Sequence, residues 1–144
     1  MSTTAITPYL FFSGRCEEAL MFYEQALGAK TEMIMRFNES PDPIPPGMLQ
    51  PGFEAKIMHC SFTIDGVRLM AADGCNDKGK MEGVQLALSV GTEAEAHKAF
   101  DSLAVGGSVG MPLNKTFWSP CFGMVTDTFN ITWMVMVPGE PVAR

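Results

Sequence analysis

The residues best suited to chemistry in this chain are a histidine and an aspartate in its first half. His59 lies in the segment "KIMHCSFTI" (56–64), where alternation places it with Ser61 and Thr63 on one face of a predicted strand. An imidazole in that position could act as a base near neutral pH, although the sequence identifies no partner and a structural histidine is the simpler interpretation. Asp73 ends "VRLMAAD", where its carboxylate could reach a cleft or could cap the loop "GCNDKG" through an Asx turn.

Two aromatic residues and four cysteines are the other candidates for chemistry. Phe117 and Trp118, in "TFWSP", could form one wall of a pocket, and burial in the core or at a subunit contact explains them equally well. The cysteines lack CxxC spacing, which predicts reduced thiols in or near the core rather than a metal site or disulfides. Only one of them lies in a polar loop where it could react: Cys16, Cys60 and Cys121 are the core candidates, and Cys75 is the exposed one.

Local patterns predict which elements position these residues. Apolar residues recur at helical spacing over 16–27, before Gly28, and over 92–103, before Gly106-Gly107, where Thr92 and Glu95 form a capping box. Alternating or apolar runs predict strands, and Asp65-Gly66 predicts a hairpin turn. The predicted strands cover 6–12, 30–37, 56–64, 67–72, 83–90, 109–117, 121–127 and the end of "DTFNITWMVM" (127–136), so that each half reads β-α-β-β-β.

Composition excludes several classes of protein. Of the 144 residues, 47% are hydrophobic and 18% are charged, which is typical of a folded globule. The net charge is −6 and no Lys/Arg cluster is present, so we expect no nucleic-acid partner. No apolar run approaches the ~18 residues of a membrane span, and the N-terminal segment has no features of a secretory signal. We therefore expect a cytoplasmic protein with no membrane partner.

The segment "NESPDPIPPGMLQPGF" (38–53) is too rich in proline to be the interior of a helix or a sheet. It predicts an extended loop that could serve as a flap over a cleft, as an arm in a dimer, or as a plain solvated excursion.

The two halves repeat one pattern. An offset of 77 residues matches the first strand and helix of each half without a gap, pairing Gly14 with Gly91, Ala19 with Ala96 and Tyr23 with Phe100. An offset of 64 matches the closing hairpins, pairing Gly66 with Asn130, Val67 with Ile131 and Met70 with Met134. Asparagine tolerates the left-handed conformation almost as glycine does, so the two turns can share one geometry.

Two modules of this kind resemble the vicinal oxygen chelate superfamily, which includes glyoxalase I, extradiol dioxygenases and bleomycin resistance proteins. The likeness is to its PhnB-like subfamily and rests on "ITPYLFFSGRCEEALMFYEQALGAK", "MHCSFTIDGVRLMAAD" and "KTFWSPCFGMVTDTFNITWMV". The resemblance implies an α+β fold in which two βαβββ modules form a curved, mostly antiparallel sheet around a cup. It further implies one domain over 1–144, with modules near 4–73 and 82–138, and a homodimer.

The resemblance also implies where a metal ion would bind. In metal-dependent members, the first and last strands of each module supply His, Gln or Glu ligands, and those places correspond in this chain to Pro8, Met70, Gln85 and Met134. Only Gln85 could ligate a hard divalent ion, because proline offers no side-chain donor and a thioether is too soft. We therefore expect no metal and no other cofactor.

Alternation predicts what lines the cup instead. Gln85, Ala87 and Ser89 share the face opposite the helix, and the same alternation turns Pro8, Leu10 and Phe12 inward in the first module. Met70 and Met134 then lie beside Gln85 and either bind a ligand or merely fill a lost metal site.

Two functions from different classes follow. The first is a binding protein that holds a small, largely apolar molecule in a metal-free cup formed by Pro8, Met70, Gln85, Met134, Phe117 and Trp118. The second is a glyoxalase- or dioxygenase-like enzyme that uses His59 or Asp73 for acid-base chemistry, or a non-standard metal site. A purely structural or partner-binding role is a third possibility.

Overall fold

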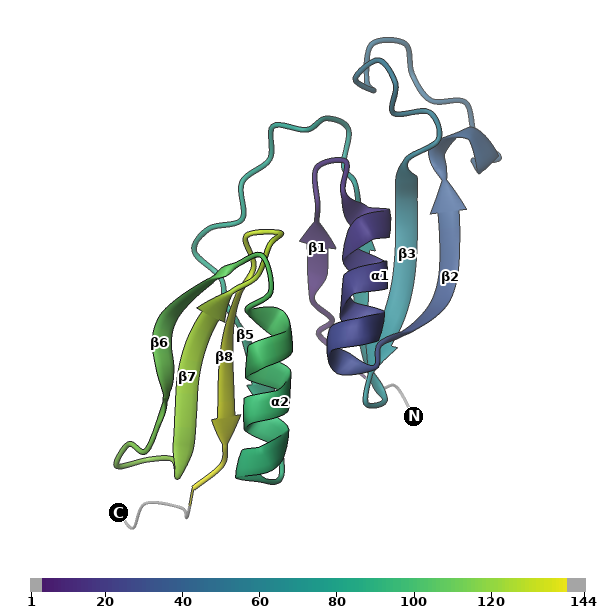
Figure 1. Cartoon of the computed structure of the whole chain (residues 1–144). Helices are drawn as coiled ribbons and strands as arrows, with labels where there is room; N and C mark the ends of the chain where they lie inside the picture. The colour runs from purple at the N-terminus through teal and green to yellow at the C-terminus, as the bar shows by residue number, and fades with distance from the viewer. Residues whose placement is uncertain (1–3, 140–144) are drawn as a thin grey trace. The chain divides into compact units, whose positions relative to one another are not determined.

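The computed structural model describes residues 4–139 and divides into two compact units, residues 1–80 and 81–144. Unit 1 consists of β1 (Tyr9–Phe11), α1 (Cys16–Leu27), β2 (Lys30–Arg36), a short 3₁₀ turn (Phe37–Glu39), β3 (Ile57–Ile64) and β4 (Val67–Ala72). Unit 2 consists of β5 (Leu86–Ser89), α2 (Glu93–Leu103), β6 (Ser108–Asn114), β7 (Cys121–Thr126) and β8 (Thr132–Val137) (Figure 1). Neither helix within residues 4–139 is long and apolar enough to cross a membrane.

Each unit builds one four-stranded sheet with the same topology. The strand orders are β1-β4-β3-β2 and β5-β8-β7-β6, so the first strand of each unit lies at an edge of its sheet, beside the last strand. Those pairs, β1 with β4 and β5 with β8, are parallel, and all the others are antiparallel. The predicted α+β fold of two βαβββ modules with mostly antiparallel pairing is confirmed.

Helix α1 covers one face of the unit 1 sheet. Its apolar positions fall three and four residues apart, and the ring of Tyr23 is fully buried and stacks on Phe62 of β3 at 6.3 Å between ring centroids. The helix ends at Gly28, which has a left-handed φ of 69° and donates its N–H to the carbonyl of Glu24. The predicted helix and its terminating glycine are confirmed.

Helix α2 does the same for unit 2. Thr92 accepts a hydrogen bond from the backbone N–H of Glu95 at 3.1 Å, which confirms the Thr92 half of the predicted capping box, and the Glu95 carboxylate accepts the Thr92 hydroxyl at 3.1 Å. The buried stripe is the predicted one: Ala96, Ala99, Phe100 and Leu103.

The closing turns of the two hairpins both use left-handed backbone. Gly66 has a φ of 83° and Asn130 a φ of 69°, which confirms the predicted match between them. Asp127 begins the second turn, as predicted, and its Oδ1 accepts the N–H of Phe129 at 2.8 Å.

The gap-free match between the first strand and helix of the two modules was wrong by one residue. Tyr9 pairs with Met70, whereas Ala87 pairs with Met134, so the two strands correspond at an offset of 78 rather than 77. Unit 1 therefore has one more residue than unit 2 between strand and helix, and two residues near that junction, Ser13 and Gly14, have positive φ values of 52° and 98°.

A slip of one residue exchanges the two faces of a strand. The prediction that Leu10 and Phe12 face the cup was consequently wrong. Both are buried on the helix side of the sheet, and the ring of Phe12 lies 6.2 Å from that of Tyr23 in α1. Tyr9 and Phe11 lie on the opposite face instead.

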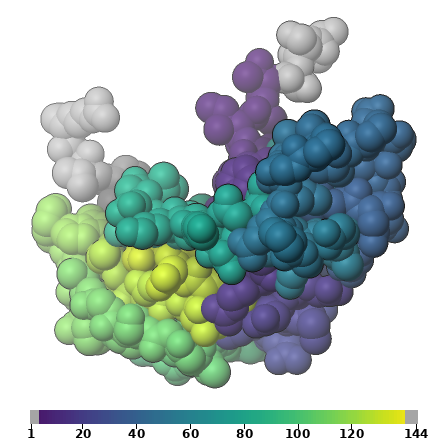
Figure 2. Space-filling view, turned by 90° about the horizontal axis from the view of Figure 1, so that it is seen from above, coloured from purple at the N-terminus to yellow at the C-terminus, as the bar shows by residue number. Residues whose placement is uncertain are grey.

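The proline-rich segment 38–53 lies on the surface of unit 1, where its atoms are blue in Figure 2. Its second half is attached to the rest of unit 1 at two points. Gln50 donates its backbone N–H to the carbonyl of Cys75 at 2.8 Å and accepts a hydrogen bond from Asp77, and Phe53 is buried against Gly14. The segment is a loop, as predicted, and these contacts hold both ends of its second half to the module.

Candidate functional site

In each unit, one face of the sheet lies under the helix and the other, which we call the open face, points away from it. Alternation on β3 separates the two in unit 1. Phe62 contacts α1 through Tyr23, and Cys60 contacts it through Cys16, whose sulfur lies 3.7 Å from that of Cys60. His59 lies on the open face, as the sequence predicted.

A tyrosine and a histidine form a hydrogen-bonded pair on the open face of unit 1. The hydroxyl oxygen of Tyr9, on β1, lies 3.0 Å from Nδ1 of His59, on β3. Burial raises the pKa of the Tyr9 phenol above its ordinary value of 10.0, so the hydroxyl is protonated at neutral pH, as an unperturbed phenol also is, and can donate. Because a phenol donates more strongly than it accepts, the contact favours the tautomer in which Nδ1 accepts and the imidazole proton is on Nε2.

Sequence reasoning missed Tyr9 because the alternation of β1 was assigned to the wrong phase. No local signal could have found it, because alternation groups Tyr9 with Phe11 without saying which face of the sheet the helix covers. The carbonyl of Pro8 accepts the N–H of Met70 at 2.9 Å, and Pro8 itself is exposed.

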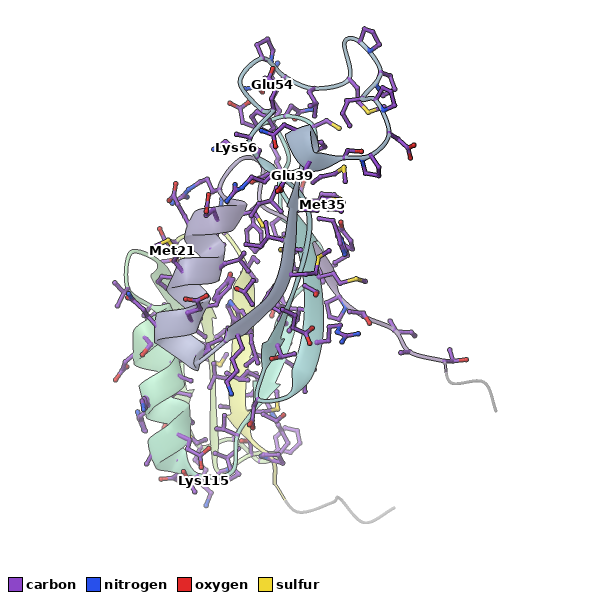
Figure 3. All side chains as sticks on the ribbon, turned by 90° about the vertical axis from the view of Figure 1, so that its right-hand side faces the viewer. Met21, Met35, Glu39, Glu54, Lys56 and Lys115 are labelled. Atoms are coloured by element: carbon purple, nitrogen blue, oxygen red, sulfur yellow. The ribbon has the colours of Figure 1, made fainter. Side chains whose placement is uncertain are left out.

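Methionine and aromatic side chains surround the Tyr9–His59 pair. The ring of Phe11 lies 5.1 Å from that of Tyr9. Met70 is the partner of Tyr9 across the sheet, and Met35 is the partner of His59. In Figure 3, Met35 lies on the opposite side of the sheet from Met21, which projects from the outer side of α1. The pair thus has apolar side chains around it, on a face that also carries Ser61 and Thr63 of β3.

The centre of the open face of unit 2 is apolar, and its polar side chains, Ser89 and the hydrogen-bonded pair Thr126–Thr132, lie in the flanking rows. One row crosses all four strands in register, and its residues are Met111 on β6, Met124 on β7, Met134 on β8 and Ala87 on β5. In the next row, Met136 lies between Phe122 and Ser89. Trp133, by contrast, is buried on the helix side, as predicted, where its Nε1 donates to Asp127 at 2.9 Å.

Three aromatic rings extend the open face of unit 2 toward the β6–β7 loop. The ring of Trp118 contacts that of Phe122 edge-on at 5.4 Å, and Phe117 contacts Trp118 in the same manner at 4.7 Å. Phe117 is 91% exposed, and Trp118 is 43% exposed. The structure thus brings both predicted aromatic residues to this face rather than into the core.

Gln85 and Asp73 have different surroundings. Gln85 directly precedes β5, is exposed, and lies two residues before Ala87 of the open face. Asp73 is 1% exposed, and its two carboxylate oxygens accept the backbone N–H groups of Cys16 at 2.8 Å and Ile57 at 2.7 Å. These contacts favour a structural role for Asp73, and it makes no Asx turn of the predicted kind.

The donor atoms at the expected ligand positions do not fit a hard divalent ion. Met70 and Met134 present thioethers on their open faces, and Gln85 presents one amide oxygen. Among residues 4–139, no group of three or more His, Cys, Asp or Glu side chains is placed to hold a metal. One amide oxygen and two thioethers are too poor a donor set to hold such an ion, whatever their spacing.

The thiols are free, as predicted. Cys16, Cys60 and Cys121 are buried and Cys75 is partly exposed. The hydrogen bond to Cys60, together with burial, raises the pKa of the Cys16 thiol, so it stays protonated at neutral pH.

Comparison with known proteins gives a consistent result. A profile of the glyoxalase/bleomycin resistance protein/dioxygenase superfamily matches residues 5–135. Protein YjdN of Escherichia coli (strain K12) is 34% identical over 140 residues, which cover 92% of this chain and 94% of YjdN.

Two solved structures are also similar. Protein PA1353 from Pseudomonas aeruginosa is 38% identical with a TM-score of 0.82, over 96% of this chain and 100% of PA1353. A Bacillus cereus PhnB protein, described as a putative 3-demethylubiquinone-9 3-methyltransferase, is 28% identical with a TM-score of 0.76, over 93% of this chain and 99% of that one. The chain therefore belongs to the glyoxalase/bleomycin resistance protein/dioxygenase superfamily and, within it, to the PhnB-like subfamily.

Proposed function

We propose that this protein binds a small, largely apolar molecule, without a metal ion, on the methionine-bearing open faces of its sheets. The observation that carries the proposal is the row Met111–Met124–Met134–Ala87, in which three flexible thioethers lie side by side on a face that no helix of the unit covers. Thioether side chains adapt their shape and contact aromatic ligands favourably. The half-buried state of Met124 and Met134 leaves part of each available for contact.

The aromatic residues beside this row support the same function. Trp118, which packs on the buried ring of Phe122, offers a flat surface against which an apolar ring can pack and adds one N–H donor. Gln85 lies at the polar end of β5 and could orient a ligand through its amide. Bleomycin resistance proteins, which share the superfamily, give a precedent for binding as a function. The homodimer expected from the resemblance stays a prediction.

A charge placed in the methionine row tests the proposal. N-phenyl-1-naphthylamine, an uncharged apolar fluorophore, is titrated into the wild-type protein and into Met134→Glu. We expect the substitution to weaken binding about tenfold or more, because the ligand would cover a carboxylate with no partner. Ala87→Glu places the same charge at an exposed position beside Met134 and serves if Met134→Glu folds poorly.

Met21→Glu is the matched control, because Met21 is 60% exposed on the outer side of α1. Its affinity for the probe should equal that of the wild type. Equal affinities in all four proteins would contradict the open face as the binding site. Metal analysis of protein purified without chelator should find no stoichiometric Ni, Mn, Fe or Zn, and a stoichiometric metal would favour the enzyme instead.

A second candidate is favoured by the Tyr9–His59 hydrogen bond, since a histidine oriented by a neighbouring hydroxyl has the geometry of an acid-base residue. In that case the bound molecule is converted as well as held. Mass spectrometry of a co-purifying molecule before and after incubation with the protein distinguishes the two: an unchanged mass favours binding.

A further inference from the structure

The polar pair of unit 1 contains an unused hydrogen-bond donor. Nδ1 of His59 accepts the hydrogen bond of the Tyr9 hydroxyl, and Nε2 of His59 has no hydrogen-bond partner among residues 4–139. Half-burial of the His59 side chain leaves this nitrogen partly accessible on the open face. Tyr9 and His59 also contact each other as rings, at 5.6 Å between centroids, so the imidazole is held in orientation as well as in tautomer.

The ring and thioether neighbours of that donor are apolar, and Ser61 is the next residue on the same face of β3. Phe11, 56% exposed, lies 5.1 Å from Tyr9 on one side, and Met35 and Met70 occupy the neighbouring strand positions. A donor N–H set among exposed aromatic and thioether groups contributes more to binding than one in water, because an apolar ligand excludes solvent from the bond. The arrangement matches a ligand that is flat and apolar with one oxygen acceptor at its edge.

We propose that His59 Nε2–H is the polar anchor of a ligand bound on the open face of unit 1 and that this ligand is a flat aromatic molecule bearing a carbonyl oxygen. Tyr9 is a positioning residue: it holds the imidazole in the tautomer that donates outward. This inference rests on the proposed binding function and deepens it by naming the chemical group that the protein recognises.

A pair of probes that differ only in the acceptor tests the anchor. 2-Acetylnaphthalene carries a carbonyl oxygen, and 2-isopropenylnaphthalene has nearly the same shape with a methylene group in its place. Equilibrium dialysis or calorimetry should give about tenfold tighter binding of the ketone by the wild type, as one hydrogen bond in an apolar setting provides. His59→Phe keeps a flat ring and should bind both probes with the affinity of the alkene.

The matched control is His97→Phe, the same substitution at an exposed histidine of α2, and it should keep the full preference for the ketone. For Tyr9→Phe we expect a smaller loss of preference. Its further readout is the long-range ¹H–¹⁵N spectrum of His59, in which the Nδ1 and Nε2 signals report the tautomer. Removal of the phenol should shift that spectrum toward a mixture of tautomers, a change that loss of packing alone would not produce.

Two results would overturn the anchor while leaving the proposed function intact: equal binding of both probes by the wild type, or a preference for the ketone that survives in His59→Phe. If neither probe binds at any soluble concentration, the proposed function fails and the anchor fails with it.

Discussion

The open faces of the two modules place a methionine at the same position of the repeated fold and surround it with different chemistry. Met70 and Met134 each lie on the last strand of their unit and pair in parallel with the first strand. The neighbours of Met70 are Tyr9 and Ser61, whereas those of Met134 are Ala87 and Met124. The two modules thus share one backbone arrangement. In the row of strand positions that contains the methionine, unit 1 has side chains that can form hydrogen bonds and unit 2 has none.

The helices of the two modules begin in different ways as well. Thr92 caps α2 from the adjacent position in the chain. Arg15 stands at the corresponding position of α1 and provides no side-chain cap, and the first N–H of that helix, from Cys16, is accepted by the buried Asp73. One module therefore relies on a local, exposed hydrogen bond where the other relies on a buried carboxylate that also binds β3.

Asp73→Ala should have the largest effect on stability. It leaves the N–H groups of Cys16 and Ile57 buried without a partner, and we expect the free energy of unfolding to fall by about 3 kcal/mol or more. Thr92→Ala, the equivalent change in unit 2, should cost only about 1 kcal/mol because water can replace an exposed cap. Urea unfolding followed by far-UV circular dichroism measures both.

Asp73→Asn sharpens the comparison, because an amide keeps one acceptor oxygen for the two N–H groups and should recover part of the loss. Equal destabilisation by Asp73→Ala and Thr92→Ala would mean that the two helix starts are energetically equivalent, against the difference in burial.

Gly123→Ala tests the packing under the helices, with a smaller effect. Gly123 on β7 pairs with Val135 on β8, and the corresponding pair in unit 1 is Cys60 on β3 with Ala71 on β4. The larger residue of the pair therefore lies on the last strand in unit 2 and on the strand before it in unit 1. A Cβ at Gly123 would lie 2.9 Å from the carbonyl oxygen of Met111 and 2.9 Å from the ring of Phe100. We expect a loss of about 2 kcal/mol on urea unfolding, typical of overpacking against backbone.

Gly110→Ala is the matched control on the neighbouring strand. Its Cβ would meet the nearest atom, the carbonyl oxygen of Met124, at an ordinary 3.7 Å, and the change should be close to neutral. Similar losses at both glycines would show that the cost arises from the strand conformation of glycine rather than from contact with α2.

The elements of this fold were predictable because their signals are local. The Thr92 cap, the left-handed Gly28 and the turns at Gly66 and Asn130 are each set by residues within a few positions, and the structure contains all of them. The methionine row could also be anticipated in part, because Met134 alternates with the buried Trp133.

The polar pair and the helix cap of unit 1 were not predictable, because their partners are distant in sequence. Tyr9 and His59 are 50 residues apart, and Asp73 is 57 residues from Cys16. The phase of β1 was lost for another reason: alternation fixes which residues share a face but not which face it is, and a single additional residue before α1 reverses the assignment. By fold position, the residue that corresponds to Gln85 is Thr7, two residues before Tyr9, rather than Pro8.

The smallest expected effect is the titration of Tyr9, and it probes the feature that distinguishes the two open faces. The chain has two tyrosines, Tyr9 and Tyr23, so subtraction of the ultraviolet titration of Tyr9→Phe from that of the wild type isolates Tyr9. Burial raises the pKa of this phenol, and the midpoint should lie above 10.0. A group whose pKa is higher in the folded state stabilises that state below its unfolded pKa, so its contribution should be lost only as the pH rises beyond 10.0 through the folded value. A midpoint at or below 10.0, in protein that circular dichroism shows to be folded, would mean that the phenol is as solvated as in the unfolded chain. Such a phenol would still be neutral at pH 7 but open to water, so its hydrogen bond to His59 would compete with solvent and would not hold the imidazole in one orientation.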